Sequence, residues 1–128
     1  MRPMIRVVTA LAFAFVSTLP SARAADADTE FDAFLARWRA AVAANDVDAV
    51  VAMTRLPFLF EGRDHAREGM AREVVPALLT VEVRHCLRTA APLREDDRYV
   101  LSCAPYQFHL WRVDGEWRWV EFAADGEG

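Results

Sequence analysis

His85 is the residue of this chain with the clearest capacity for acid–base chemistry. It alternates with Val81, Val83 and Leu87, and a period of two is typical of a strand whose alternate side chains share one face. An imidazole on an inward, apolar face could transfer a proton to or from a bound molecule. The alternative is a core or rim histidine that is satisfied by one hydrogen bond. We therefore treat His85 as the candidate catalytic residue.

Two further groups of polar residues could take part in binding. Tyr106 and Arg112 could orient an anionic ligand on the inner face of a sheet, although such residues also cap its rim. Asp64, His65 and Glu68 form a compact D-H-x-x-E group that could hold a metal ion or relay a proton, but charged loop clusters are usually only solvated. The sequence contains no Ser-His-Asp order, phosphate loop or metal-spaced histidine pair. We expect no metal and no cofactor, and the sequence favours a non-catalytic protein over an enzyme.

The chain has two cysteines, Cys86 and Cys103. An oxidising compartment would join them in a disulfide worth about 3 kcal/mol, whereas one isolated pair is too small a ligand set for zinc. If residues 81–88 and 99–104 form a hairpin that turns near residues 94–95, the two cysteines lie directly opposite one another. The spacing therefore predicts a disulfide across two paired strands.

Aromatic residues could build either a filled core or the apolar wall of a pocket. The residues concerned are Trp38, Phe58, Phe60, Trp117 and Trp119. A small domain needs most of its aromatic side chains for packing, and any remaining pocket would suit a flat apolar molecule with one polar end. The candidate ligand-binding residues are Trp38, Phe60, Tyr106, Arg112 and Trp119.

The N-terminal residues have the pattern of a secretory signal peptide. A basic segment, residues 1–6, precedes a short apolar run over residues 7–16. Ala22-Arg23-Ala24 supplies the small-x-small pattern that signal peptidase recognises, and the run is shorter than the roughly 20 apolar residues of a membrane anchor. We expect cleavage after Ala24, which leaves residues 25–128 as a single periplasmic or secreted domain without membrane association.

The charge balance argues against polyanionic partners. The chain has 15 basic residues, all of them arginine, and 19 acidic residues, for a formal net charge of −4. Cleavage after Ala24 removes three arginines and no acidic residue, so the mature chain carries −7. Such a domain repels nucleic acid and anionic membrane surfaces. Because the arginines are spread along the chain, we attribute the absence of lysine to coding bias.

The first half of the mature chain has helical periodicity. Thr29 is suited to cap a helix that ends near Asn45, with an apolar stripe along one side. The stripe consists of Phe31, Phe34, Leu35, Trp38 and Val42. Asp46 can cap a second helix, and a third helical segment begins at Met70, with Pro76 expected to kink or restart it.

The other segments predict short strands and a terminal hairpin. Residues 56–60 form an apolar run typical of a brief strand, and residues 63–69 a charged loop. Asp114-Gly115 between residues 106–113 and 116–122 is the strongest hairpin signal of the sequence. Pairing across this turn places Tyr106, Phe108, Leu110, Arg112, Trp117, Trp119 and Glu121 on the inner face. The outer face then holds His109, Trp111, Val113, Arg118, Val120 and Phe122, with a cation–π pair between Trp111 and Arg118.

The order of these elements resembles that of the nuclear transport factor 2-like (SnoaL-like) superfamily. The matching pieces are the helical segment FDAFLARWRAAVAANDVDAVVAM, the strand PFLFEG and the closing hairpin around Asp114-Gly115 with Trp117. The resemblance implies an α+β fold in which N-terminal helices pack in a strongly bent, mixed or antiparallel sheet that forms a cone. The alternative is another α+β sandwich with a C-terminal meander.

For function, the superfamily implies a pocket between helices and sheet, and dimers that pack sheet on sheet. Its members include isomerases, dehydratases and epoxide hydrolases, and also proteins without known activity. The enzymes use pocket-facing Asp, His, Tyr or Arg side chains. The isomerase arrangement of a buried tyrosine with paired acids has no matching residues in this chain.

Three functions are compatible with the sequence. The favoured one is an exported, non-catalytic binding or accessory domain with an apolar pocket for a small apolar ligand. The second is a small acid–base enzyme that works through His85, with Tyr106 or Arg112 holding the substrate. The third is a protein-binding inhibitor or immunity-type module that uses the outer sheet face with His109 and Trp111. We also expect a homodimer to form through that face.

Overall fold

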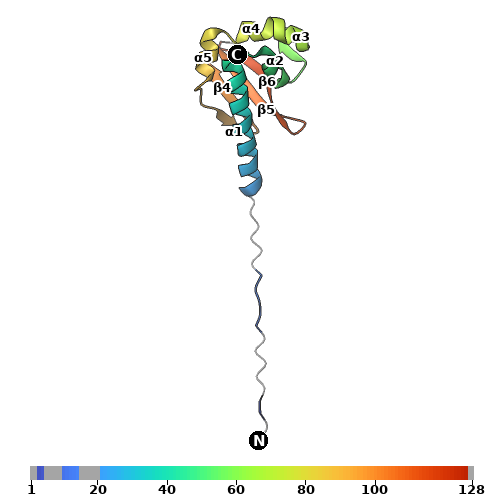
Figure 1. Ribbon diagram of the computed structural model, residues 1–128, viewed down its shortest axis with the longest axis vertical. Coiled ribbons are helices and arrows are strands. Elements are labelled where there is room, and N and C mark those ends of the chain that lie inside the picture. Colours follow the sequence, from blue (N-terminus) through green and yellow to red (C-terminus); the bar gives the residue numbers. More distant parts are fainter. Residues whose placement is uncertain (1–2, 5–9, 15–20, 127–128) are drawn as a thin grey trace.

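The computed structural model describes residues 3–4, 10–14 and 21–126, with only the backbone described for residues 21–27. The predicted leader, residues 1–24, lies in large part outside the described residues. Helices come first, and a four-stranded antiparallel sheet that ends in a hairpin follows (Figure 1). The predicted α+β class is confirmed, and a separate two-stranded sheet is also present. No helix of the described part has the length and hydrophobicity needed to cross a membrane.

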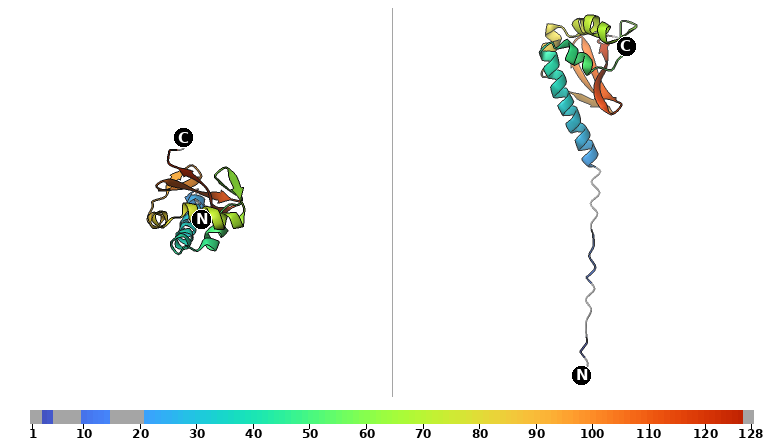
Figure 2. Two further views of the ribbon diagram at one scale, coloured as in Figure 1. Left: turned by 90° about the horizontal axis from the view of Figure 1, so that it is seen from above. Right: turned by 45° about the vertical axis from the view of Figure 1, so that its right-hand side comes forward.

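Helix α1 (Ser21–Ala43) carries the predicted apolar stripe. Its stripe residues are all buried: Phe31, Phe34, Leu35, Trp38 and Val42. The helix begins at Ser21, so the predicted cap at Thr29 is wrong. Alanine-rich residues 21–27 have high helix propensity and extend the helix toward its N-terminus, past the end of the sheet (Figure 2).

Helix α2 (Val47–Ala52) is capped as predicted, because Asp46 Oδ1 accepts a hydrogen bond of 3.2 Å from the Ala49 amide. The residues after α2 then run along strand β6 (Glu116–Ala124). Trp119 N donates to the carbonyl of Met53, and Arg55 N donates to the carbonyl of Trp119, each at 2.9 Å. This parallel contact covers part of the sheet edge.

Strands β1 (Phe58–Phe60) and β2 (Arg63–His65) form a small antiparallel hairpin. Its turn residues, Glu61 and Gly62, both have positive φ, as a two-residue hairpin requires. The predicted strand over residues 56–60 is confirmed at Phe58–Phe60, but the predicted loop over residues 63–69 is wrong. This segment contains β2 and the short helix α3 (Arg67–Gly69).

The third helical segment is present, but it begins at Arg67 with α3, three residues before the predicted start at Met70. It continues as a π-helical turn, η1 (Met70–Val74), and helix α4 (Val75–Leu78). Pro76 lies in the first turn of α4, the part of a helix where a missing N–H is best tolerated. The wider π turn before it accommodates the restart.

Residues 81–87 form a helix, α5 (Val81–Leu87), and the predicted strand is wrong. Thr80 Oγ1 caps the helix by accepting from the Val83 amide at 3.3 Å. Val83 and Leu87 are buried at i,i+4 spacing, which fits a helix as well as the alternation fits a strand. The Cys86–Cys103 disulfide is confirmed, with Cα atoms 5.8 Å apart, but it joins α5 to the sheet and does not cross two strands.

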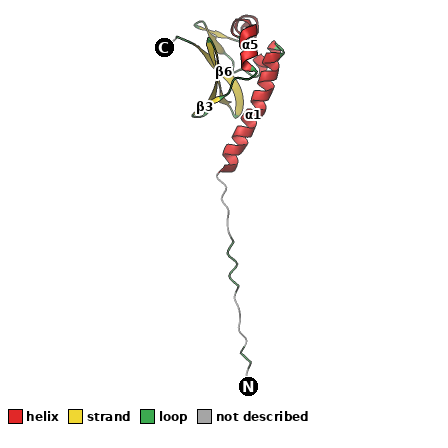
Figure 3. Ribbon diagram, turned by 90° about the vertical axis from the view of Figure 1, so that its left-hand side faces the viewer, coloured by secondary structure: helices red, strands yellow, loops and turns green. Residues whose placement is uncertain are grey.

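The four-stranded sheet has the order β3-β4-β5-β6. Its first strands are β3 (Leu93–Glu95), β4 (Arg98–Cys103) and β5 (Tyr106–Val113). Glu95 pairs with Arg98, so the chain turns at residues 96–97 and not at the predicted 94–95. Figure 3 shows α1 and α5 on the same side of this sheet.

The terminal hairpin is confirmed, with Asp114 and Gly115 at φ values of 52° and 82° in its turn. A bulge at His109/Leu110 leaves Val120 as an extra residue on β6. Beyond the bulge the faces are exchanged, so Phe122 lies opposite Phe108 on the inner face and Glu121 lies opposite His109 on the outer face. The predicted faces of Glu121 and Phe122 are therefore wrong.

Trp111 lies opposite Arg118, as predicted, but their predicted cation–π contact is wrong. The cation nearest Trp111 is Arg98, whose guanidinium carbon lies 4.3 Å from the ring centroid, and Arg55 lies at 5.8 Å. Arg118 instead donates to the Ala52 carbonyl at 2.9 Å. The guanidinium group of Arg118 therefore binds the end of α2 at the edge of the sheet.

Candidate functional site

The aromatic residues predicted to line a pocket are divided between the core and the edge of the sheet. Trp38 and Trp119 are both 0% exposed and meet edge-on, with ring centroids 6.0 Å apart. Phe58 and Phe108 pack against Trp119 at centroid distances of 4.8 and 5.5 Å. Trp38 and Trp119 therefore fill the core, and neither lines any of four grooves that lie on the surface of the described residues.

Phe60 and Tyr106 lie at the edge of the domain and are partly exposed. Their rings contact Phe122 at centroid distances of 5.7 and 5.9 Å. Neither residue lines one of the four grooves. These two predicted ligand-binding residues thus form an aromatic rim with Phe122.

His85 is exposed on α5, because its segment is helical. Tyr106 and Arg112 lie near the two ends of β5. Within the described part of the chain, no hydrogen bond or ion pair joins His85 to either residue. The prediction of an inward-facing strand, which made His85 a candidate, is wrong. The predicted acid–base set of His85, Tyr106 and Arg112 is therefore not assembled.

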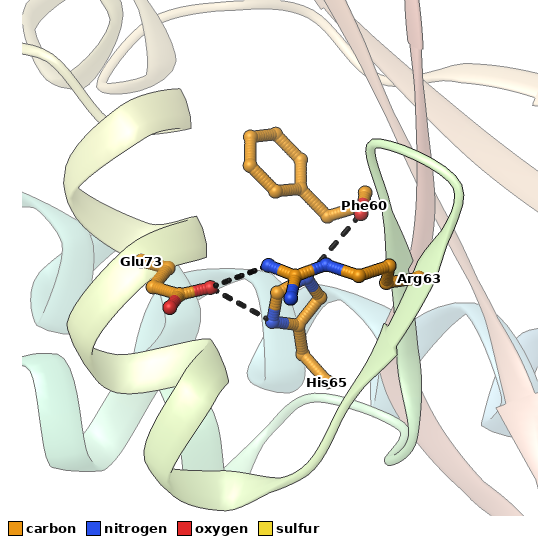
Figure 4. A network of polar contacts seen from close by, with 4 residues as sticks. All are labelled: Phe60, Arg63, His65 and Glu73. Atoms are coloured by element: carbon orange, nitrogen blue, oxygen red, sulfur yellow. Dashed lines mark hydrogen bonds and ion pairs between the residues drawn. The ribbon is translucent and has the colours of Figure 1, made fainter.

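His65 has a different and well-defined environment (Figure 4). Its ring is buried, with Nε2 3.3 Å from the Phe60 carbonyl oxygen and Nδ1 3.4 Å from Glu73 Oε2. Arg63 also contacts Glu73, at 3.4 Å. The ring occupies space left by Gly69, where a Cβ atom would lie 2.9 Å from Nδ1.

Both ring nitrogens of His65 therefore face oxygen acceptors within the protein. The ring fastens the β1–β2 hairpin to η1, and neither nitrogen faces one of the four grooves. Among the described residues, no hydrogen bond or ion pair joins Asp64 or Glu68 to the ring, so the D-H-x-x-E group is not assembled around it. Among the described residues, no cluster of three or more histidine, cysteine or acidic side chains is placed to hold a metal ion.

A groove between α1 and the tip of the β5–β6 hairpin has the features of a ligand site, and we call it the hairpin groove. Its volume is about 470 Å³ and it opens to solvent. Phe34 from α1, Met53 from the end of α2 and Trp117 from β6 supply apolar lining, and Arg37 from α1 lies among them. Phe34 and Arg37 are neighbours on one helix face because their spacing is i,i+3.

Arg37 is the uncompensated charge of the hairpin groove. Glu30, which also lines it, is paired with Arg112 at 3.5 Å, and Glu116 is paired with Arg118. Arg37 is exposed and has no hydrogen bond or ion pair within the described residues. With Arg112, which lies beside the groove, counted against Glu30, the positive charge of Arg37 is left unpaired beside apolar side chains.

Trp117 links the groove to a polar network behind it. Its buried Nε1 has no hydrogen-bond partner among the described residues, and its ring contacts Phe31 edge-on at 4.9 Å. Phe31 stacks on Tyr99 at 3.7 Å, and the Tyr99 hydroxyl donates to Asp28 Oδ1 at 2.9 Å. Burial, and then the hydrogen bond to Asp28, raise the pKa of Tyr99 above its usual value of 10.0, so the hydroxyl stays a neutral donor near pH 7.

This arrangement can bind an anion that carries an apolar body. The planar fork of Arg37 matches a carboxylate, and charge-assisted hydrogen bonds are stronger than neutral ones. Met53 is partly exposed, and Phe34 and Trp117, at 2% and 9% exposure, form a mostly covered apolar floor beneath it. The flat molecule with one polar end that we expect from the sequence fits this groove better than the filled inner face.

The sequence identifies only the margin of this site. Arg112, a predicted ligand-binding residue, lies beside the groove, where it holds Glu30 and donates to the Gly115 carbonyl at 3.0 Å. The sequence alone does not identify Arg37 and Met53 as residues of this site, because α1, α2 and the hairpin are far apart in the sequence. The available signal was the i,i+3 placement of Arg37 beside Phe34 on one helix face.

Comparisons with known proteins do not assign a family. The chain matches no family model, and no curated protein or solved structure shows significant similarity to it. The resemblance to the nuclear transport factor 2-like superfamily stays a prediction.

Proposed function

We propose that this chain is exported and that its mature part is a binding domain of nuclear transport factor 2-like type without catalysis of its own. The N-terminal basic and apolar segments and Ala22-Arg23-Ala24 support cleavage after Ala24. The Cys86–Cys103 disulfide supports an oxidising compartment, the periplasm or the extracellular space. Cleavage after Ala24 would leave Asp28 in the mature chain, so the contacts of its carboxylate with Tyr99 and Arg94 would be kept.

The ligand that we assign to the hairpin groove is a flat apolar molecule with one anionic end. The observation that carries this assignment is the unpaired guanidinium of Arg37 beside Phe34, Met53 and Trp117. The mature chain carries a net charge of −7, so a groove with net positive charge is a local departure from the acidic character of the domain. An acid–base enzyme is the weaker candidate, since His85 stands apart from Tyr106 and Arg112.

Binding of another protein, or of a second copy, through the outer sheet face is a separate candidate. Val100 and Val120 are buried although they lie outside the main core. Both ring nitrogens of His109 are buried on that face without a hydrogen bond among the described residues, and Nδ1 lies 3.9 Å from Glu121 Oε1. Sedimentation velocity of the mature protein tests the homodimer, and a monomer at all concentrations would contradict it.

Isothermal titration calorimetry with 2-naphthoate and uncharged 2-naphthamide tests the assigned ligand class. The two probes share one flat body and differ in the anionic group. We expect 2-naphthoate to bind about fivefold more tightly, as one exposed ion pair allows. Arg37→Gln should remove this difference, because it removes the unpaired charge.

Arg72→Gln is the matched control. Arg72 is exposed, has no ion pair among the described residues and lines none of the four grooves, so its loss should leave both affinities unchanged. Equal affinity for the two probes, or binding of neither, would overturn the assigned ligand class. Steady conversion of a bound probe would contradict a non-catalytic domain.

A further inference from the structure

A second groove adjoins the hairpin groove, and we call it the α3 groove because Arg67 of α3 lines it. Its volume is about 330 Å³, and it lies between the end of α2, α3 and the turn of the β5–β6 hairpin. Glu116 and Arg118 line both grooves. The two grooves are therefore neighbours along the hairpin.

Arg118 and Glu116 form a neutral boundary between the grooves. Arg118 Nη1 donates to the Ala52 carbonyl at 2.9 Å, and its Nη2 pairs with Glu116. These contacts join β6 to the end of α2, and the charges of Arg118 and Glu116 compensate one another. The boundary adds no net charge to either groove.

The α3 groove has an uncompensated positive charge of its own. Arg55 and Arg67 line it, both are exposed, and neither has a carboxylate partner within the described residues. Asp114 also lines the groove and offsets one of these two charges. One net positive charge remains, as in the hairpin groove.

We infer that the ligand of the hairpin groove carries a second anionic group that reaches the α3 groove. The preferred ligand is then an elongated dicarboxylate with an apolar middle. Its two charged ends match the unpaired positive charges of the two grooves, and its uncharged middle adds no charge opposite the ion pair of Arg118 and Glu116. This inference rests on the proposed function, because it places the first carboxylate at Arg37.

Two probes of equal shape isolate the contribution of the second carboxylate. These are 2,6-naphthalenedicarboxylate and its half amide, 6-carbamoyl-2-naphthoate, which has one anionic end. In calorimetry of the mature protein we expect the dicarboxylate to bind about fivefold more tightly than the half amide. Added salt should reduce this advantage, since the extra interaction is electrostatic and solvent-exposed.

Two substitutions should change the advantage in opposite directions. Arg67→Gln should remove it, whereas Asp114→Asn should enlarge it about twofold by removing the opposing carboxylate. Asparagine suits the positive φ of 52° at residue 114, so the hairpin turn is kept. Arg72→Gln should leave the ratio of the two affinities unchanged.

The outcomes separate this inference from the function on which it rests. If both probes bind equally and 2-naphthoate binds in an Arg37-dependent manner, the dicarboxylate is overturned and the binding domain stands. If none of the probes binds, both are overturned. An advantage that survives Arg67→Gln would also overturn the inference, because it would not depend on the net charge of the α3 groove.

Discussion

Replacement of Gly69 by alanine should destabilise the protein through its effect on His65. A Cβ atom at residue 69 would lie 2.9 Å from His65 Nδ1, so the imidazole would have to shift. The shift would disturb the contacts of the ring with the Phe60 carbonyl and Glu73, and overpacking of a buried site costs about 1–3 kcal/mol. Gly69 has helical φ and ψ, so alanine returns up to about 1 kcal/mol of helix propensity. The expected net loss of unfolding free energy is about 1 kcal/mol.

Gly69→Ala should change the unfolding free energy in the opposite direction when His65 is also replaced by alanine. The ring atoms are then absent, and Gly69→Ala should raise the unfolding free energy by up to about 1 kcal/mol through helix propensity. Urea unfolding of the wild type, both single variants and the double variant, followed by tryptophan fluorescence with the disulfide intact, gives the coupling between the two sites. Effects of equal sign and size in both backgrounds would refute the steric argument and the fastening role of His65.

Three further predictions concern the polar network, the groove and export. Because burial and Asp28 raise the pKa of Tyr99 above 10.0, its contribution to stability is complete below pH 10 and is lost as the pH rises beyond that value. A difference absorbance titration between the wild type and Tyr99→Phe measures this ionisation, and a midpoint at or below pH 10 would contradict the network. Glu30→Gln should tighten 2-naphthoate binding about twofold in calorimetry, because it removes a carboxylate from the groove and frees Arg112, whereas weaker binding would speak against this charge balance. The intact mass of protein from the periplasmic fraction should correspond to a chain that begins at Ala25, and an uncleaved chain would contradict the signal peptide.

Elements with a strong local signal could be predicted from the sequence. The turn at Asp114-Gly115 depends only on the backbone conformation of these two residues. Asp46 caps α2 through a contact with the amide three residues later. The segment of α5 was ambiguous, because Val83 and Leu87 fit both an alternating strand and an i,i+4 helix face. The cap at Thr80 decides for the helix, and it could have been recognised in the sequence.

Features that depend on distant segments could not be predicted. The bulge that places Phe122 inward lies beside Trp119, where the chain after α2 pairs with the sheet edge. The disulfide was predicted with the wrong partner elements, since a helix can also bring Cys86 near Cys103. The hairpin groove forms where α1, the end of α2 and the hairpin tip lie together, and no local sequence pattern predicts that these segments are close in space.

The most direct test of the hairpin groove is a titration of the isotopically labelled mature protein with 2-naphthoate, followed by proton–nitrogen correlation spectra. The account predicts saturable shifts of the Trp117 indole N–H and of the backbone amides of Phe34 and Arg37. The Trp38 indole, buried in the core, should not respond. Shifts at Trp111 on the outer sheet face, with Trp117 and Arg37 unchanged, would contradict the account.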